Sequence, residues 1–139
     1  MDSGLMTRYA HGTFTVTITP LPTEEGIGDA SIGRMALQKV FEGDMIGSAN
    51  GQMLAVRSDV KGSAGYVAMD RVAATLDGRS GTFALQHSGT MERGAPQLRI
   101  SVVPDSGTGE LAGITGTLDI EIRDGQHFYA FTYHLPDAE

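Results

Sequence analysis

Two residues on neighbouring strand-like segments are candidates for acid–base chemistry. Asp70 lies on the apolar face of its segment, and His87 shares a face with Phe83 and Leu85 on the next one. The Asp-Gly turn at 77–78 joins the two segments as a hairpin, and counting outward from it places Asp70 opposite residue 85 or 86. We therefore expect Asp70 and His87 to approach one another diagonally. A carboxylate–imidazole pair in a dry pocket is suited to act as a general base.

The same pair has structural interpretations as well. A lone buried carboxylate is costly unless it is paired or protonated, so an ion pair with His87 could simply join two strands. If the face assignment is inverted, Asp70 pairs instead with Arg71 or Arg79 at the surface. The face on which Arg34 lies is also undecided from the sequence. Arg34 is either an anchor for an anion in a pocket or a charge on the outer surface.

The last strand-like segment carries two tyrosines and a histidine on one face. Its two-residue period places His127, Tyr129, Phe131, Tyr133 and Leu135 together. This face is the bulkier of the two, so we expect it to point inward. Hydroxyl and imidazole groups in an apolar interior can serve catalysis or form a satisfied polar network, and both interpretations stay open.

These faces define the candidate site. The predicted catalytic residues are Asp70, His87, Tyr129 and Tyr133. The predicted substrate-binding residues are Tyr66, Phe83, Leu85, His127, Phe131, Met35 and Phe41.

Metal, thiolate and nucleotide chemistry is not expected. The chain has no cysteine, and its four histidines are not closely spaced in sequence. Gly107-x-Gly109 precedes a strand-like segment rather than a helix, so it predicts a structural turn and not a dinucleotide-binding loop. Ser88 follows His87 directly, and neighbouring strand residues face opposite ways, which excludes a serine–histidine pair. We therefore expect no cofactor and no metal.

The elements that position these residues are predicted to be strands. Period-two alternation recurs between turn signals, and no amphipathic helix is apparent. Short loops make neighbouring strands antiparallel, and eight strands without a covering helix must close or leave exposed edges. We therefore predict an all-β, eight-stranded antiparallel barrel, lipocalin-like in outline, whose interior can hold side chains or one small ligand. A β-sandwich is the alternative. The expected strands span 13–19, 31–41, 45–57, 65–76, 80–91, 97–103, 114–122 and 126–135.

Composition narrows the range of partners and compartments. The 139 residues fit one domain, 1–139, and the formal net charge of −7 with ten dispersed basic residues argues against nucleic acid or an anionic membrane as partner. The absence of cysteine fits a reducing compartment, and residues 1–10 show no signal-peptide pattern. A cytoplasmic location is therefore expected.

Two stretches resemble a known family. LDGRSGTFALQHSGT at 76–90 and VPDSGTGELAGITG at 103–116 are similar to a bacterial family of small domains of unknown function with an allene oxide cyclase-like fold. The likeness extends from Gly12 to Tyr133, and 107–116 also resembles a turn of allene oxide cyclases and plant dirigent proteins. The resemblance implies the barrel fold. It also implies a homo-oligomer, because cyclase-family barrels often associate.

Three hypotheses for function follow. The first is a cofactor-independent cyclase or isomerase that confines a small apolar substrate, polyketide-, lipid- or terpenoid-like, inside the barrel. The alternative is a non-catalytic binding protein for a small lipophilic ligand. The third is an oligomerising protein whose threonine-rich outer faces pair with other copies.

Overall fold

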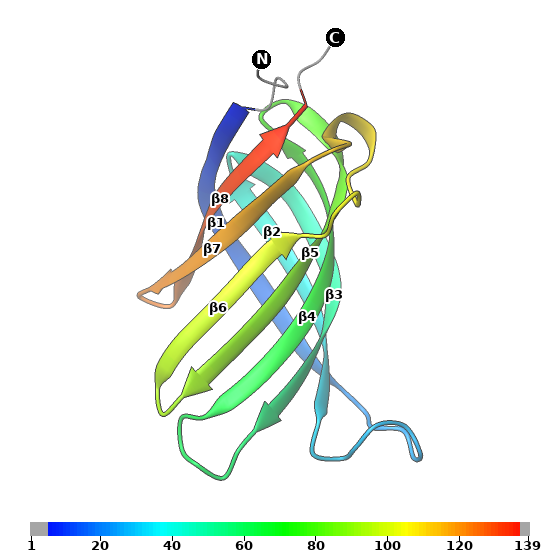
Figure 1. Ribbon diagram of the computed structural model, residues 1–139, viewed down its shortest axis with the longest axis vertical. Helices are drawn as coiled ribbons and strands as arrows, with labels where there is room; N and C mark the ends of the chain where they lie inside the picture. The colour runs from blue at the N-terminus through cyan, green and yellow to red at the C-terminus, as the bar shows by residue number, and fades with distance from the viewer. Residues whose placement is uncertain (1–5, 137–139) are drawn as a thin grey trace.

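Eight strands make up nearly all of the chain. The computed structural model describes residues 6–136. Its strands are β1 (Met6–Leu21), β2 (Gly33–Gly43), β3 (Met45–Arg57), β4 (Ala64–Leu76), β5 (Arg79–Glu92), β6 (Ala95–Val102), β7 (Thr115–Arg123) and β8 (Gln126–Leu135), with one short 3-10 helix, η1 (Gly109–Leu111). They form a closed barrel in sequence order, all antiparallel (Figure 1), which confirms the predicted fold class.

The first strand is longer than the sequence pattern predicted. β1 begins at Met6 rather than at residue 13, and it continues through Pro20. Its first part pairs with β8 and its second part with β2, so it spans both neighbours at different heights of the barrel. Residues 7–11 lack clean alternation, which hid this part of the strand. Pro20 is tolerated because it lies at the end of the strand.

The inward faces differ sharply between the two ends of the barrel. At the packed end, where β1 begins and β8 ends (top of Figure 1), phenylalanine, tyrosine and leucine side chains from all around the wall are 0–5% exposed. The loop after β6 adds Leu111 and Ile114, which are 0% and 1% exposed. At the other end, the inward-facing Ile18, Met91 and Leu98 are 50%, 42% and 43% exposed. We call the region lined by Ile18, Met35, Met53, Tyr66, Met91 and Leu98 the open end.

The wall of the barrel is weakest between β6 and β7. A single pair of residues, Ser101 and Thr117, joins these strands, whereas β3 and β4 pair over thirteen positions from Met45 to Arg57. Below that pair the two strands part (Figure 1). We call the unpaired stretch the β6–β7 seam. Leu98 lies on β6 within this unpaired stretch.

A tyrosine hydroxyl holds the turn between β2 and β3. Tyr129 on β8 accepts a hydrogen bond from the backbone N–H of Met45 (2.9 Å) and donates to the carbonyl of Glu42 (2.9 Å). Gly12 on β1 leaves room for this contact, because a Cβ there would lie 2.5 Å from the hydroxyl. Gly43 supplies the positive φ, 103°, that the turn needs.

Removing this hydroxyl should destabilise the barrel. Tyr129→Phe strands the N–H of Met45, a fully buried residue, and should lower the free energy of unfolding by about 1–3 kcal/mol. Tyr9→Phe, at a 65% exposed position on β1, should change it by less than about 0.5 kcal/mol. Urea denaturation followed by circular dichroism measures both. Equal effects of the two substitutions would contradict the role given to Tyr129.

Candidate functional site

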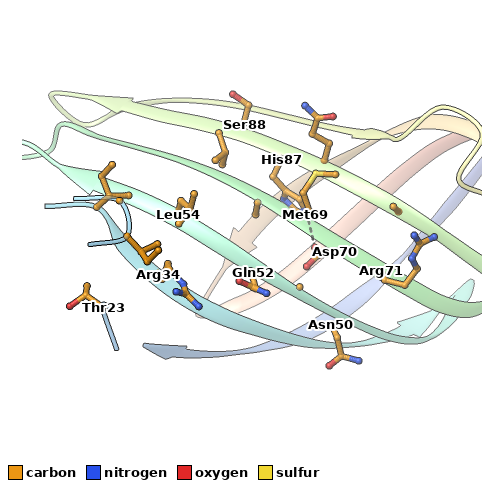
Figure 2. A pocket seen from close by; sticks show the side chains of 18 of the residues that line it. Thr23, Arg34, Asn50, Gln52, Leu54, Met69, Asp70, Arg71, His87 and Ser88 are labelled. Carbon is orange, nitrogen blue, oxygen red and sulfur yellow. Dashed lines mark hydrogen bonds and ion pairs between the residues drawn. The ribbon is translucent and has the colours of Figure 1, made fainter. Parts of the chain in front are cut away.

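Three ionisable side chains meet inside the barrel. Lys39 on β2, Asp70 on β4 and His87 on β5 all point inward. Lys39 Nζ lies 2.7 Å from Asp70 Oδ2, and His87 Nε2 lies 2.8 Å from the same oxygen. Figure 2 shows the Asp70–His87 contact across two adjacent strands. The expected diagonal approach is therefore observed, on a register in which Asp70 pairs with Leu85.

The residues of β3 make the Lys39 contact possible. Lys39 pairs with Ala49 and Asp70 pairs with Gly51, so the strand between lysine and aspartate offers only small inward groups. A Cβ on Gly51 would lie 2.3 Å from Asp70 Oδ1. The long lysine side chain can therefore cross β3 and reach the carboxylate. We call Lys39, Asp70 and His87 the ion cluster.

The ion cluster is almost completely shielded from solvent. The side chains of Lys39, Asp70 and His87 are 8%, 0% and 4% exposed. Burial raises the pKa of Asp70, but the His87 hydrogen bond and the charge of Lys39 outweigh it and hold the pKa below its usual value. Asp70 is thus ionised at neutral pH. Its second oxygen, Oδ1, has no hydrogen-bond partner among the described residues.

One residue of the open end, Tyr66, lies on the same strand and the same face as Asp70 of the ion cluster. Tyr66, four residues before Asp70 on β4, points inward and is half-buried, with its ring against Gly89, where a Cβ would lie 2.3 Å from the ring. Burial raises the pKa of its phenol, and the negative charge of Asp70 raises it further. Tyr66 is therefore protonated at neutral pH and can donate a hydrogen bond at the open end.

The structure does not bring the other predicted catalytic residues to this cluster. The hydroxyl of Tyr129 is engaged with the backbone of the β2–β3 turn. Burial raises the pKa of Tyr133, and the next contribution comes from Asp77 in the β4–β5 turn, which places this phenol at the packed end. Both tyrosines point inward as expected, but far along the barrel from Asp70. Their assignment to catalysis stays a prediction.

The predicted substrate-binding residues divide between the two ends. Phe41, Phe83, Leu85 and Phe131 belong to the tightly packed core, at 2%, 0%, 1% and 1% exposure. Half-buried positions are held by Tyr66, Met35 and His127. His127 packs against the ring of Phe14, with centroids 5.1 Å apart. Tyr66 and Met35 therefore remain the best placed of the set to touch a ligand.

Lys39 was not predicted from the sequence as part of the site, although the alternation of residue types on its strand indicated that it points inward. It alternates with Leu37 and Phe41, so it occupies an inward position of β2. A lysine at such a position must find a buried partner. Arg34, which the sequence left open, falls on the outward face of β2 opposite Leu54.

Comparison with known proteins identifies the family. The model of the family described as "Protein of unknown function (DUF3224)" matches residues 10–133. The chain belongs to the DUF3224 family. A crystal structure of a DUF3224 protein of unknown function from Shewanella oneidensis MR-1 is 42% identical, with a TM-score of 0.85. The alignment covers 95% of this chain and 100% of that one. The curated proteins contain no match.

Two absences complete the description of the site in this DUF3224 protein. Within residues 6–136, no three histidine, cysteine or acidic side chains gather closely enough to hold a metal ion. Over the same range, no helix has the length and apolar character needed to cross a membrane.

The ion cluster makes a prediction about stability. Lys39→Met leaves a buried carboxylate with only His87 beside it, and should cost about 3–5 kcal/mol of unfolding free energy. The matched control is Lys61→Met, at the other lysine of the chain, which is exposed and should change stability little. Lys39→Met combined with Asp70→Asn should lose less than the sum of the two single changes. Additive losses in urea denaturation would show that the two side chains are not coupled.

The same cluster predicts how stability depends on pH. The pKa of Asp70 is lower in the folded protein than in the unfolded chain, so its contribution is fully present above the unfolded value, near 3.8. It is lost as the pH falls through the folded value. Wild type should therefore lose stability below about pH 4 more steeply than Asp70→Asn. Parallel curves from urea denaturation between pH 2.5 and 6 would contradict the ionised state of Asp70.

Proposed function

We propose that this DUF3224 protein binds a small apolar molecule at the open end of its barrel. One observation carries the proposal. Three inward-facing apolar side chains at the open end, Ile18, Met91 and Leu98, are 42–50% exposed, whereas the phenylalanine, tyrosine and leucine side chains at the packed end are 0–5% exposed. A barrel interior that its own side chains fill leaves no such surface. Covering it is favourable by about 25 cal/mol per Å² of apolar area.

The lining of the open end suits an adaptable binding site. Met35, Met53 and Met91 all point into it, and methionine side chains adjust to irregular apolar shapes. Leu98 and Ile18 add branched walls. The β6–β7 seam beside Leu98 supplies a lateral route that requires few backbone hydrogen bonds to break. These features support an apolar ligand of variable outline.

The base of the open end is polar at one point. Tyr66 offers a protonated phenol there, since burial and the Asp70 charge both raise its pKa. An apolar wall with one placed hydrogen-bond donor is the usual composition of a small-molecule site. The ligand supported best is therefore a lipophilic molecule with a single carbonyl, hydroxyl or ether oxygen.

A charge placed in the open end should abolish binding. Leu98→Asp and Leu54→Asp change the same residue type at 43% and 44% exposure, on the inner and outer faces respectively. We expect Leu98→Asp to weaken binding of the neutral dye N-phenyl-1-naphthylamine at least about tenfold, because the carboxylate must be desolvated. Leu54→Asp should bind like wild type. Equal affinities of the three proteins in a fluorescence titration would exclude the open end as the site.

A second candidate function is acid–base catalysis on the bound molecule. It is favoured by the placement of the Tyr66 phenol near the ionised Asp70, with His87 and Lys39 fixing that carboxylate. Tyr66 could donate a hydrogen bond to the oxygen of an opening epoxide or a forming enolate, as in a cofactor-free cyclase or isomerase. Asp70 and His87 are too deeply buried to touch substrate, so in this scheme they act only through the negative charge of Asp70, which raises the pKa of Tyr66.

The substitution Tyr66→Phe distinguishes a catalytic protein from one that only binds a ligand. If the protein is a cyclase or isomerase, Tyr66→Phe should lower kcat for an epoxide or polyene substrate about 10²-fold or more while leaving dye affinity within about threefold. Tyr9→Phe, on the outer surface, is the control and should retain full activity. A panel on which wild type shows no turnover, or on which Tyr66→Phe is fully active, would leave binding alone as the function.

A further inference from the structure

The outer surface of β3 and β4 carries an apolar cluster unlike the rest of the exterior. Leu54, Val56, Val67 and Met69 point outward and are 44%, 43%, 52% and 50% exposed. Leu54 pairs directly with Val67, so the four side chains adjoin one another across two strands. Elsewhere on β3, the outward-facing Ile46 pairs with Thr75 and stands apart from them. Contiguous apolar surface of this kind marks an interaction site.

The loop between β1 and β2 extends this surface. It runs along the open end and projects past the barrel wall (Figure 1), with Ile27 and Ile32 62% and 37% exposed. Between the loop and the outer faces of β2–β5 lies a hollow of about 1190 Å³. Figure 2 shows Leu54, Met69 and Arg34 among the residues that line it.

Charges of both signs are arranged on this face. Arg34 and Arg71 line the sheet side of the hollow, and Glu24 and Asp29 line the loop side. None of the four forms an ion pair among residues 6–136, and Arg71 makes only a hydrogen bond to the carbonyl of Ser106, 3.4 Å away. The carboxylate of Asp29 accepts hydrogen bonds from the backbone N–H and the hydroxyl of Ser31. These bonds lower the pKa of Asp29 and keep it ionised.

We propose that this face is the interface of a homodimer with two-fold symmetry. In an isologous contact the same patch meets itself, so a surface must complement its own copy. In such a dimer, the acidic loop of each copy would face the arginines of the other copy. The two contacts would flank a shared apolar centre at Leu54, Val67 and Met69. A chain with a net charge of −7 repels its own copy, and these arginine–carboxylate pairs offset that repulsion locally.

The oligomeric state tests the proposal. Sedimentation equilibrium of the full chain from 1 to 200 µM should show a monomer–dimer equilibrium. Leu54→Asp should weaken association at least about 100-fold, because it places a charge at the apolar centre. Ile46→Asp, also outward on β3 but outside the cluster, should leave association unchanged. A monomeric wild type over this range, or equal effects of the two variants, would overturn the proposal.

Charge reversal gives a second test that does not depend on the apolar centre. Arg34→Glu should weaken the dimer about tenfold or more, and Glu24→Arg in the same chain should restore at least part of that loss, since the pair is then reversed. Failure of the double variant to recover any association would also overturn the proposal. Leu98→Asp should remain dimeric, so loss of ligand binding and loss of dimerisation are separable. If an anionic amphiphile occupied the hollow instead, wild type would be monomeric and would bind dodecyl phosphate there.

Discussion

The ion cluster is the constraint on which the interior of the barrel depends. Burying a carboxylate is tolerable only when hydrogen bonds and an opposite charge compensate it, and Lys39 and His87 supply both at a single oxygen of Asp70. Meeting that requirement places an alanine and a glycine on β3, so that the lysine can cross the strand. Aliphatic packing therefore ends at the cluster, and the barrel is divided into a packed end and an open end.

The division of the interior also explains the β6–β7 seam. Strands that enclose a packed core gain by pairing along their whole length, whereas β6 and β7 pair only where they leave the packed end. Continuing the register of Ser101 and Thr117 toward the open end would place Leu98 opposite Ile120 and Arg99 opposite Asp119. The inner pair is apolar and the outer pair is oppositely charged. The two strands are thus compatible with further pairing, and under the proposed binding function the seam is where the wall would adjust to a ligand.

Period-two alternation and turn chemistry predicted eight strands and the Asp70–His87 pair, although the first half of β1 was missed. Alternation assigns each side chain to a face, and the Asp-Gly turn at 77–78 fixes the register of one hairpin. Neither gives the height of a residue along the barrel, which depends on how all eight strands are staggered. That is why Tyr133 and Phe131 were correctly placed inside yet fall at the packed end, away from Asp70. The contact from Lys39 spans two strands and rests on small residues between them, a relation that no single segment of sequence displays.

Methionine methyl NMR tests the central claim, which is that a small apolar molecule binds at the open end of the barrel. Met35, Met53 and Met91 face the open end, Met45 is fully buried at the packed end, and Met69 lies on the outer surface. Titration with decanol should shift the methyl signals of the first three and leave those of Met45 and Met69 in place. Shifts of Met69 alone, or none at saturating decanol, would contradict the account.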